Sequence, residues 1–133
     1  MIFTVYGKPQ GKARPRFTRA GHAYTPDSTR EYEDAVKMAY IAAGGSMIPA
    51  GVPVRVEITA VYPIPKSATS TMRGKMASGA ILPTVKPDWD NVGKIVCDAL
   101  NGIAWHDDAQ VTQATVYKVY GETPVVTIEI REV

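Results

Sequence analysis

The chain has 133 residues and one cysteine, Cys97, so it has enough length for a single domain with a real core and cannot form an internal disulfide. It has no apolar run long enough to span a membrane and begins as a strand without a basic leader, so we expect a soluble, unprocessed, cytoplasmic protein. The net charge is only +2. This small value does not exclude a polyanionic partner, because the charges are distributed unevenly along the chain.

The first third of the chain predicts a strand, a basic loop and a helix. Ile2 to Tyr6 is predicted to be a strand. Ser28 to Glu31 offers a capping box for a helix that should end at Gly44-Gly45. The apolar stripe of this helix comprises Tyr32, Ala35, Val36, Ala39, Tyr40 and Ala43.

Two stretches of the chain are strongly basic. Residues 1–30 carry six lysines and arginines against one acid, Asp27, and residues 63–86 carry four against none. Such stretches are suited to bind the backbone of a polyanion, although basic loops are also commonly exposed to solvent without binding anything. The candidate DNA-binding residues are Lys8, Lys12, Arg14, Arg16, Arg19, Lys66, Arg73, Lys75 and Lys86.

A strand and a second helix are predicted in the middle of the chain. Val54 to Tyr62 alternates apolar with polar residues, which indicates a half-buried strand. From Asn91 onward, apolar residues recur at helical spacing, and Asn101-Gly102 supplies the usual left-handed stop. The stripe of this helix comprises Val92, Ile95, Val96, Ala99, Leu100 and Ile103.

The remaining elements define the expected fold. Val111 to Tyr120 and Val125 to Arg131 are predicted to form an antiparallel hairpin. The order is then strand, helix, strand, long loop, helix, strand, strand. It predicts one α/β (α+β-like) domain over residues 1–133, a small mixed sheet with two helices packed on one face. The other face would need cover, and a homodimer would supply it.

Carboxylates and one lysine concentrate around the second helix. Pro87 favours extended geometry before it, so Asp88 and Asp90 are expected to project on the same side. Lys94 lies one helical turn beyond Asp90, away from the apolar stripe. The pair Asp107-Asp108 precedes the next strand. At the start of that strand, the pair could lie close to the helix N-terminus that carries Asp88 and Asp90.

These residue types suit a magnesium site that cleaves phosphodiesters. Mg²⁺ binds one or two carboxylates and keeps several waters. It polarises a phosphoryl oxygen and supplies hydroxide, and two ions would clamp both the attacking and the leaving oxygen. A lysine adds positive charge where the pentacovalent phosphate is most negative. An EF-hand is excluded because the fifth and twelfth positions from Asp88 are Val92 and Ala99.

Each candidate residue also has an ordinary structural role open to it. Asp88 or Asp90 could cap the helix. Lys94 could be a solvated lysine paired with Asp98, which would contribute little to stability. One residue of the pair Asp107-Asp108 could serve the turn, and spacing does not say which.

The string Lys-Pro-Asp-Trp-Asp-Asn at residues 86–91, followed by Lys94, Asp98-Ala-Leu and Asp107-Asp108-Ala-Gln-Val, resembles the RusA family of Holliday junction resolvases. The opening Gly7 to Arg16 and the later Tyr24-Thr-Pro resemble the phage and Gram-positive branch of that family. Matching motifs extend from residue 7 to residue 111, which is most of the chain.

Three features depart from the family pattern. Trp89 stands where an aliphatic residue is more usual, and Gly93 weakens the first helical turn. Residues 66–86 form a longer loop than compact members carry. These departures put the function of the loop in doubt more than the chemistry of the acidic residues and Lys94.

The resemblance implies a homodimeric, Mg²⁺-dependent endonuclease that nicks four-way DNA junctions symmetrically, with Mn²⁺ as an expected substitute. It implies a bacterial or prophage-encoded protein of recombination and repair. It places the catalytic, metal-binding triad on Asp88, Asp90 and Asp108, and the essential catalytic lysine on Lys94.

Two other function classes remain open. A non-catalytic branched-DNA-binding module, in which the aspartates are structural, would bind junctions and never cut them with Mg²⁺ or Mn²⁺. A sugar transferase would use Asp88-x-Asp90 as its metal-nucleotide motif. It ranks last because the chain has neither room for a nucleotide-sugar domain nor a glycine-rich phosphate loop.

Overall fold

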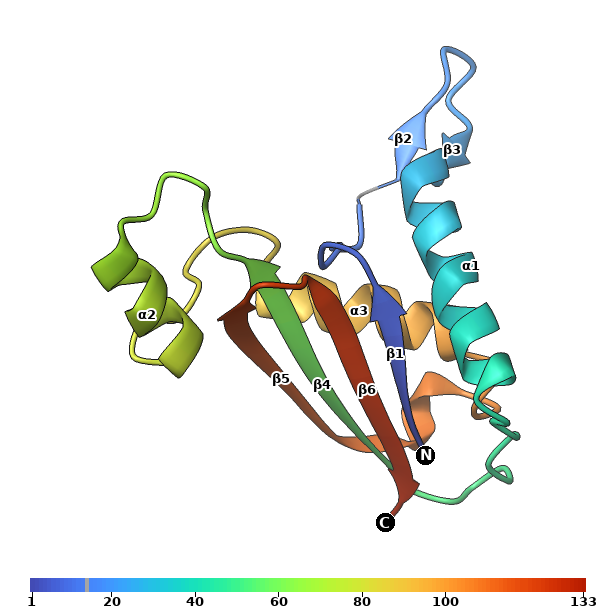
Figure 1. The fold of residues 1–133 in the computed structure, drawn as a ribbon. Coiled ribbons are helices and arrows are strands. Elements are labelled where there is room, and N and C mark those ends of the chain that lie inside the picture. Colours follow the sequence, from blue (N-terminus) through green and yellow to red (C-terminus); the bar gives the residue numbers. More distant parts are fainter. Residues whose placement is uncertain (14) are drawn as a thin grey trace.

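The structure is a computed structural model that describes residues 1–13 and 15–133, so the predicted DNA contact Arg14 lies outside the described residues. A four-stranded sheet in the order β1-β6-β4-β5 forms the centre of the molecule (Figure 1). Its strands are β1 (Ile2–Tyr6), β6 (Val125–Glu132), β4 (Val54–Pro63) and β5 (Val111–Gly121). Because β4 pairs parallel with β5 and antiparallel with β6, the predicted mixed sheet is confirmed.

The predicted hairpin of β5 with β6 is wrong, although both strands exist. Strand β4 lies between them: Val56 pairs with Ala114 of β5 on one side and with Ile130 of β6 on the other. The inward side chains of β4, such as Val56 and Ile58, are fully buried, as suits a central strand. The turn signal after Gly121 marks a reversal of the chain but does not say which strand fills the space between the two arms.

Two helices pack on one sheet face, as predicted. Helix α1 (Asp27–Ala42) packs on β1 and on α3 (Trp89–Leu100), and α3 also packs on β5 (Figure 1). The predicted stripe of α3 is confirmed from Val92 to Leu100, since its buried residues are Val92, Ile95, Val96, Ala99 and Leu100, but Ile103 lies in the turn beyond the helix and is only half-buried. The opposite sheet face exposes aromatic residues, with Tyr6 80% and Tyr117 51% exposed.

Helix α1 starts without the predicted capping box. Pro26 occupies the N-cap position, and no side-chain cap bond is formed there. Because Asp27 is already helical, Ser28 stands inside the first turn rather than before it, and Asp27 pairs with Arg30 instead. The predicted end is confirmed by Gly44, whose φ of 84° lies in the left-handed region.

Both basic stretches contain structure that the sequence pattern missed. The first carries the short hairpin of β2 (Arg16–Phe17) and β3 (Ala23–Tyr24), and the predicted long loop contains helix α2 (Ser70–Ser78). Helix α2 buries only Met76, so it has no apolar stripe to recognise; the Thr69 hydroxyl caps its start. Figure 1 shows the hairpin projecting past one end of the sheet and α2 projecting sideways from the edge strand β5, far from the hairpin.

None of the helices in residues 1–13 and 15–133 is long and apolar enough to cross a bilayer.

Candidate active site

Asp88 and Asp90 lie in different backbone conformations at the start of α3. Asp88 is the extended N-cap residue, and the helix begins at Trp89, so Asp90 already belongs to the first turn. The predicted same-side projection of the two aspartates is therefore wrong, because it assumed extended geometry as far as Asp90. Asp88 does not cap the helix with its side chain; it lies 3.6 Å from the Lys86 ammonium and is half exposed.

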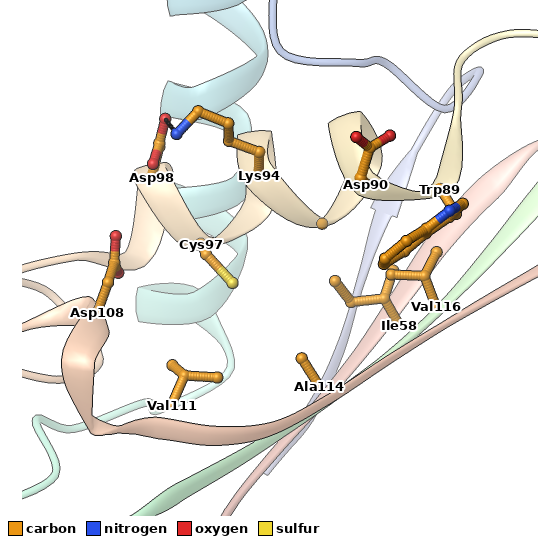
Figure 2. Close-up of a pocket in the computed structure, with 11 residues that line it drawn as sticks. Ile58, Trp89, Asp90, Lys94, Cys97, Asp98, Asp108, Val111, Ala114 and Val116 are labelled. Atoms are coloured by element: carbon orange, nitrogen blue, oxygen red, sulfur yellow. Dashed lines mark ion pairs between the residues drawn. The ribbon is translucent and has the colours of Figure 1, made fainter.

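A pocket of about 320 Å³ lies between α3 and β5, and it collects most of the predicted catalytic residues. Asp90 and Lys94 line it from the helix, and Asp108 lines it from the opposite end (Figure 2). Asp88 is not among its lining residues. The rest of the lining is largely apolar and comprises Ile58, Trp89, Gly93, Cys97, Val111, Ala114 and Val116, together with Asp98.

Asp108 is held in place by a buried tryptophan. The indole Nε1 of Trp105 donates a hydrogen bond of 2.8 Å to Asp108 Oδ1. Trp105 is fully buried, so this bond ties the carboxylate to the core. Asp107 has the other role left open by the sequence: its carboxylate accepts from Ala109 N at 2.9 Å and caps the 3₁₀ turn η1 (Asp108–Gln110). Asp107 is thus the turn residue, and Asp108 faces the pocket.

Gln110 fixes this turn to the rest of the domain. Its buried amide donates to Pro49 O at 2.9 Å and to Val52 O at 3.1 Å. Its Oε1 accepts from the backbone N–H groups of His106 and Asp107. Sequence reasoning missed Gln110 and Trp105 as site residues. The Asp-x-x-Gln spacing of a capping box, from Asp107 to Gln110, was the available signal for the first.

A chain of ion pairs connects Lys94 to the first basic stretch. Lys94 Nζ lies 3.7 Å from Asp98 Oδ2, and Lys12 Nζ lies 3.1 Å from the same oxygen (Figure 2 shows the first pair). Lys12 also pairs with Glu33 at 3.0 Å, and its side chain is only 19% exposed. Desolvation lowers the pKa of Lys12, but hydrogen bonds to Glu33 and Asp98 outweigh it and raise the pKa. Asp98, considered from sequence only as a partner of Lys94, is therefore also an anchor for the N-terminal loop.

Backbone packing near Pro87 reinforces this anchor. Lys12 N donates to Asn91 O at 3.0 Å, and a Cβ on Gly11 would lie 2.8 Å from Pro87 Cβ. The Tyr62 hydroxyl donates to Pro87 O at 2.5 Å, and burial, followed by the charge of Asp88, raises the pKa of this tyrosine to about 12. The segment that leads into α3 is thus fixed from both the N-terminal loop and β4.

Cys97 lies on the pocket wall but is suited to packing rather than chemistry. Burial raises the pKa of its thiol to about 12, and the charges of Asp108 and Asp98 add to this effect while Lys94 opposes it. A thiol with this pKa stays protonated at neutral pH, so it is a poor nucleophile and metal ligand. This agrees with its expected role as a small helix residue.

The other predicted DNA contacts fall into two groups. Arg73 is half-buried, donates to Pro65 O and lies 3.7 Å from Glu122. The remaining described cations are exposed to solvent: Lys8, Arg16, Arg19, Lys66, Lys75 and Lys86.

The donor set suits magnesium by chemistry, with one restriction. Carboxylate oxygens are the donors that Mg²⁺ prefers, and it needs only one or two of them beside waters and phosphate oxygens. Within residues 1–13 and 15–133, however, no three acidic, histidine or cysteine side chains lie close enough together to hold one ion. The arrangement therefore fits a site of one or two carboxylates, and the triad of Asp88, Asp90 and Asp108 is not gathered around one point.

Comparison with known proteins identifies the class of protein that carries this pocket. The family model described as endodeoxyribonuclease RusA matches residues 6–131, nearly the whole chain. The chain therefore belongs to the RusA endodeoxyribonuclease family, and the predicted resemblance is confirmed. It is also 38% identical over 136 residues to "Uncharacterized protein YqaN" of Bacillus subtilis (strain 168), covering 98% of this chain and 95% of that protein.

Proposed function

We propose that this protein is a Mg²⁺-dependent endonuclease that resolves Holliday junctions by paired, symmetric nicks in DNA recombination and repair. One observation supports this most strongly: a chain of the RusA family brings Asp90, Lys94 and Asp108 to one pocket from two separate elements. The protein would act in a bacterial cytoplasm, encoded by the host or a prophage.

The pocket residues have distinct roles in this proposal. Asp90 and Asp108 would each offer a carboxylate to the metal, and Asp88 would add a third acidic group from the N-cap of α3. The chemistry that Mg²⁺, or Mn²⁺ in its place, would supply there is an activated water and polarisation of the phosphodiester. The Lys94 ammonium, on the pocket rim, stabilises the extra negative charge of the phosphate in the transition state. Trp105 and Asp98 act through these groups, as positioning residues.

The two projecting elements are suited to hold the arms of a branched substrate. The β2–β3 hairpin carries the exposed cations Arg16 and Arg19, and α2 carries Lys75. The hairpin projects beyond one end of the sheet and α2 projects sideways from β5 (Figure 1), with the start of α3 between them. Phosphate contacts from such cations give affinity without base specificity.

A homodimer is proposed because a junction presents two equivalent strands and each chain carries one such pocket within its described residues. The sheet face away from the helices is the candidate interface. It carries the exposed Tyr6 and Tyr117, with the half-buried Val61 between the edge strands.

The decisive experiment is a cleavage assay on a labelled four-way junction. Purified protein should cut the junction at symmetric positions with Mg²⁺ and not with EDTA, and it should leave a linear duplex of the same sequence intact. Tight junction binding with no cutting under Mg²⁺ or Mn²⁺ would favour the binding-module alternative instead.

A further inference from the structure

Trp89 is unusual for a residue at the start of a helix against the core. It is 64% exposed, although tryptophan is highly buried on average. It lines the pocket at the end opposite to Asp108, beside Ile58 and Val116 (Figure 2). A flat, solvent-exposed aromatic ring at the mouth of an apolar pocket is the kind of surface on which nucleobases stack.

The space beneath Trp89 exists because two small residues line it. Ala114 is exposed, although its neighbour in the sheet, Val56, is fully buried, so α3 does not cover this part of β5. Gly93 stands on α3 where glycine costs about 1 kcal/mol of helix stability relative to alanine. A Cβ at Gly93 would meet Val116 at 3.4 Å, an ordinary contact, so folding does not require the glycine. Its effect is to leave the pocket open.

The walls and the rim of the pocket differ in chemistry. Figure 2 shows apolar side chains on the strand side of the pocket, while Lys94 and the carboxylates of Asp90, Asp98 and Asp108 stand at its rim. A nucleotide matches this division, because its base is flat, aromatic and uncharged, while the Lys94 ammonium and a metal ion held by the carboxylates would neutralise its anionic phosphate. A second protein copy matches it poorly, because seating it there would desolvate the charged rim.

We propose that this pocket takes one unstacked nucleobase of the DNA substrate, stacked on Trp89, and so sets the adjacent phosphate between Asp90 and Asp108. The proposal rests on the proposed nuclease function. A volume of about 320 Å³ lies at the small end of ligand pockets, which suits a single base. Unstacking is least costly where pairing is already disturbed, as at a branch point. Base capture would therefore contribute to both structure selectivity and the sequence preference of cutting.

Two variants test the proposal, each with a matched control. Trp89→Ala removes the stacking surface, and Met72→Ala removes an exposed apolar side chain from α2. Ala114→Val fills the pocket from β5 with a residue that strands favour, and Thr115→Val changes the next residue, on the opposite sheet face. Thermal melting of each variant verifies that it is folded.

The probe is a four-way junction with 2-aminopurine placed in turn at each position around the branch point, bound in EDTA. Wild-type protein should change the fluorescence of one position, and both test variants should abolish that change while the controls keep it. In Mg²⁺, single-turnover cutting by the test variants should fall by about 5- to 150-fold, the size of one base-stacking contact.

The outcomes separate this proposal from the function on which it rests. If wild-type protein cuts and both test variants cut within twofold of it with an unchanged fluorescence pattern, the pocket holds no base. If wild-type protein never cuts, the nuclease function fails, and the fluorescence pattern in EDTA still decides base capture. If Trp89→Ala instead converts a dimer into monomers in sedimentation, Trp89 is a subunit contact and the proposal is wrong.

Discussion

The two ends of the pocket are built in different ways. At one end, Asp108 is bonded to the fully buried Trp105, and Gln110 closes the turn with four hydrogen bonds. At the other end, Trp89 is 64% exposed and Lys86 pairs only loosely with the half-exposed Asp88. The first end is fixed by the protein before any substrate arrives, and the second leaves surface for the substrate to cover.

Asp108, at the fixed end of the pocket, can be tested against the adjacent Asp107, which has the same charge and a different role. Asp108→Asn should abolish junction cleavage while junction affinity stays equal or rises, because a negative charge beside the phosphate is removed. Asp107→Asn should cut at close to the wild-type rate, because asparagine caps a turn about as well as aspartate. Equal losses in single-turnover assays of the two variants would remove the distinction between them.

Lys94 tests the chemistry at the middle of the pocket. Lys94→Ala should lower the single-turnover rate by about 10²–10³, with affinity little changed, because the charge acts mainly in the transition state. Lys37→Ala, on α1 away from the pocket lining, is the matched control. A change of less than threefold would reduce Lys94 to a surface lysine paired with Asp98.

We expect the exposed cations of the two basic stretches to supply much of the affinity for DNA. Neutralising Arg16, Lys75 and Lys86 together should weaken binding to junction and duplex alike and flatten the salt dependence of log affinity by about 0.9 per lost phosphate contact. The cutting rate at saturating protein should stay the same. A folded triple variant with an unchanged salt slope would place these residues away from the DNA.

The hydrogen bonds of Gln110 at the fixed end of the pocket should contribute measurably to the free energy of unfolding. Gln110→Ala removes the four part-buried hydrogen bonds that this buried side chain makes to the backbone, and it should lower the free energy of unfolding by about 1–3 kcal/mol in urea denaturation. Thr115→Ala, at an exposed strand position, should stay within about 0.5 kcal/mol of wild type. If both variants unfold alike, the turn that carries Asp108 is not held by Gln110.

Cys97 should have the smallest effect of all. Because its folded pKa of about 12 is raised above the ordinary value of 9.0, its contribution to stability is complete below pH 9 and is lost as the pH rises from 9 toward 12. At pH 8, iodoacetamide should therefore label the native thiol much more slowly than the thiol of unfolded protein, and Cys97→Ala should cut within about threefold of wild type. Equal labelling of native and unfolded protein would contradict the raised pKa.

The local pattern predicted the helix of the site but not the contacts across it. The stripe from Val92 to Leu100 follows from helical periodicity, which depends only on neighbours in the sequence. The partners of β5 and the bonds of Gln110 to Pro49 and Val52 depend on segments far apart in the chain, which no local pattern records.

The acidic residues show the same division. Spacing could not separate Asp107 from Asp108, because only the position of Trp105 decides which carboxylate is drawn toward the pocket. Asp98 was recognised as a partner of Lys94 because the two lie four residues apart on one helix. Its second partner, Lys12, comes from the other end of the chain and was instead predicted to bind DNA.

The central claim is that each pocket cuts one strand and that two pockets act together on one junction. Mixing wild-type protein with the Asp108→Asn variant and adding a supercoiled cruciform plasmid tests this most directly. The account predicts that the mixed dimers leave nicked circles, while wild-type dimers give linear product by paired cuts. Linear product in proportion to wild-type chains alone, from a species that sediments as a 14.4 kDa monomer on the junction, would contradict it.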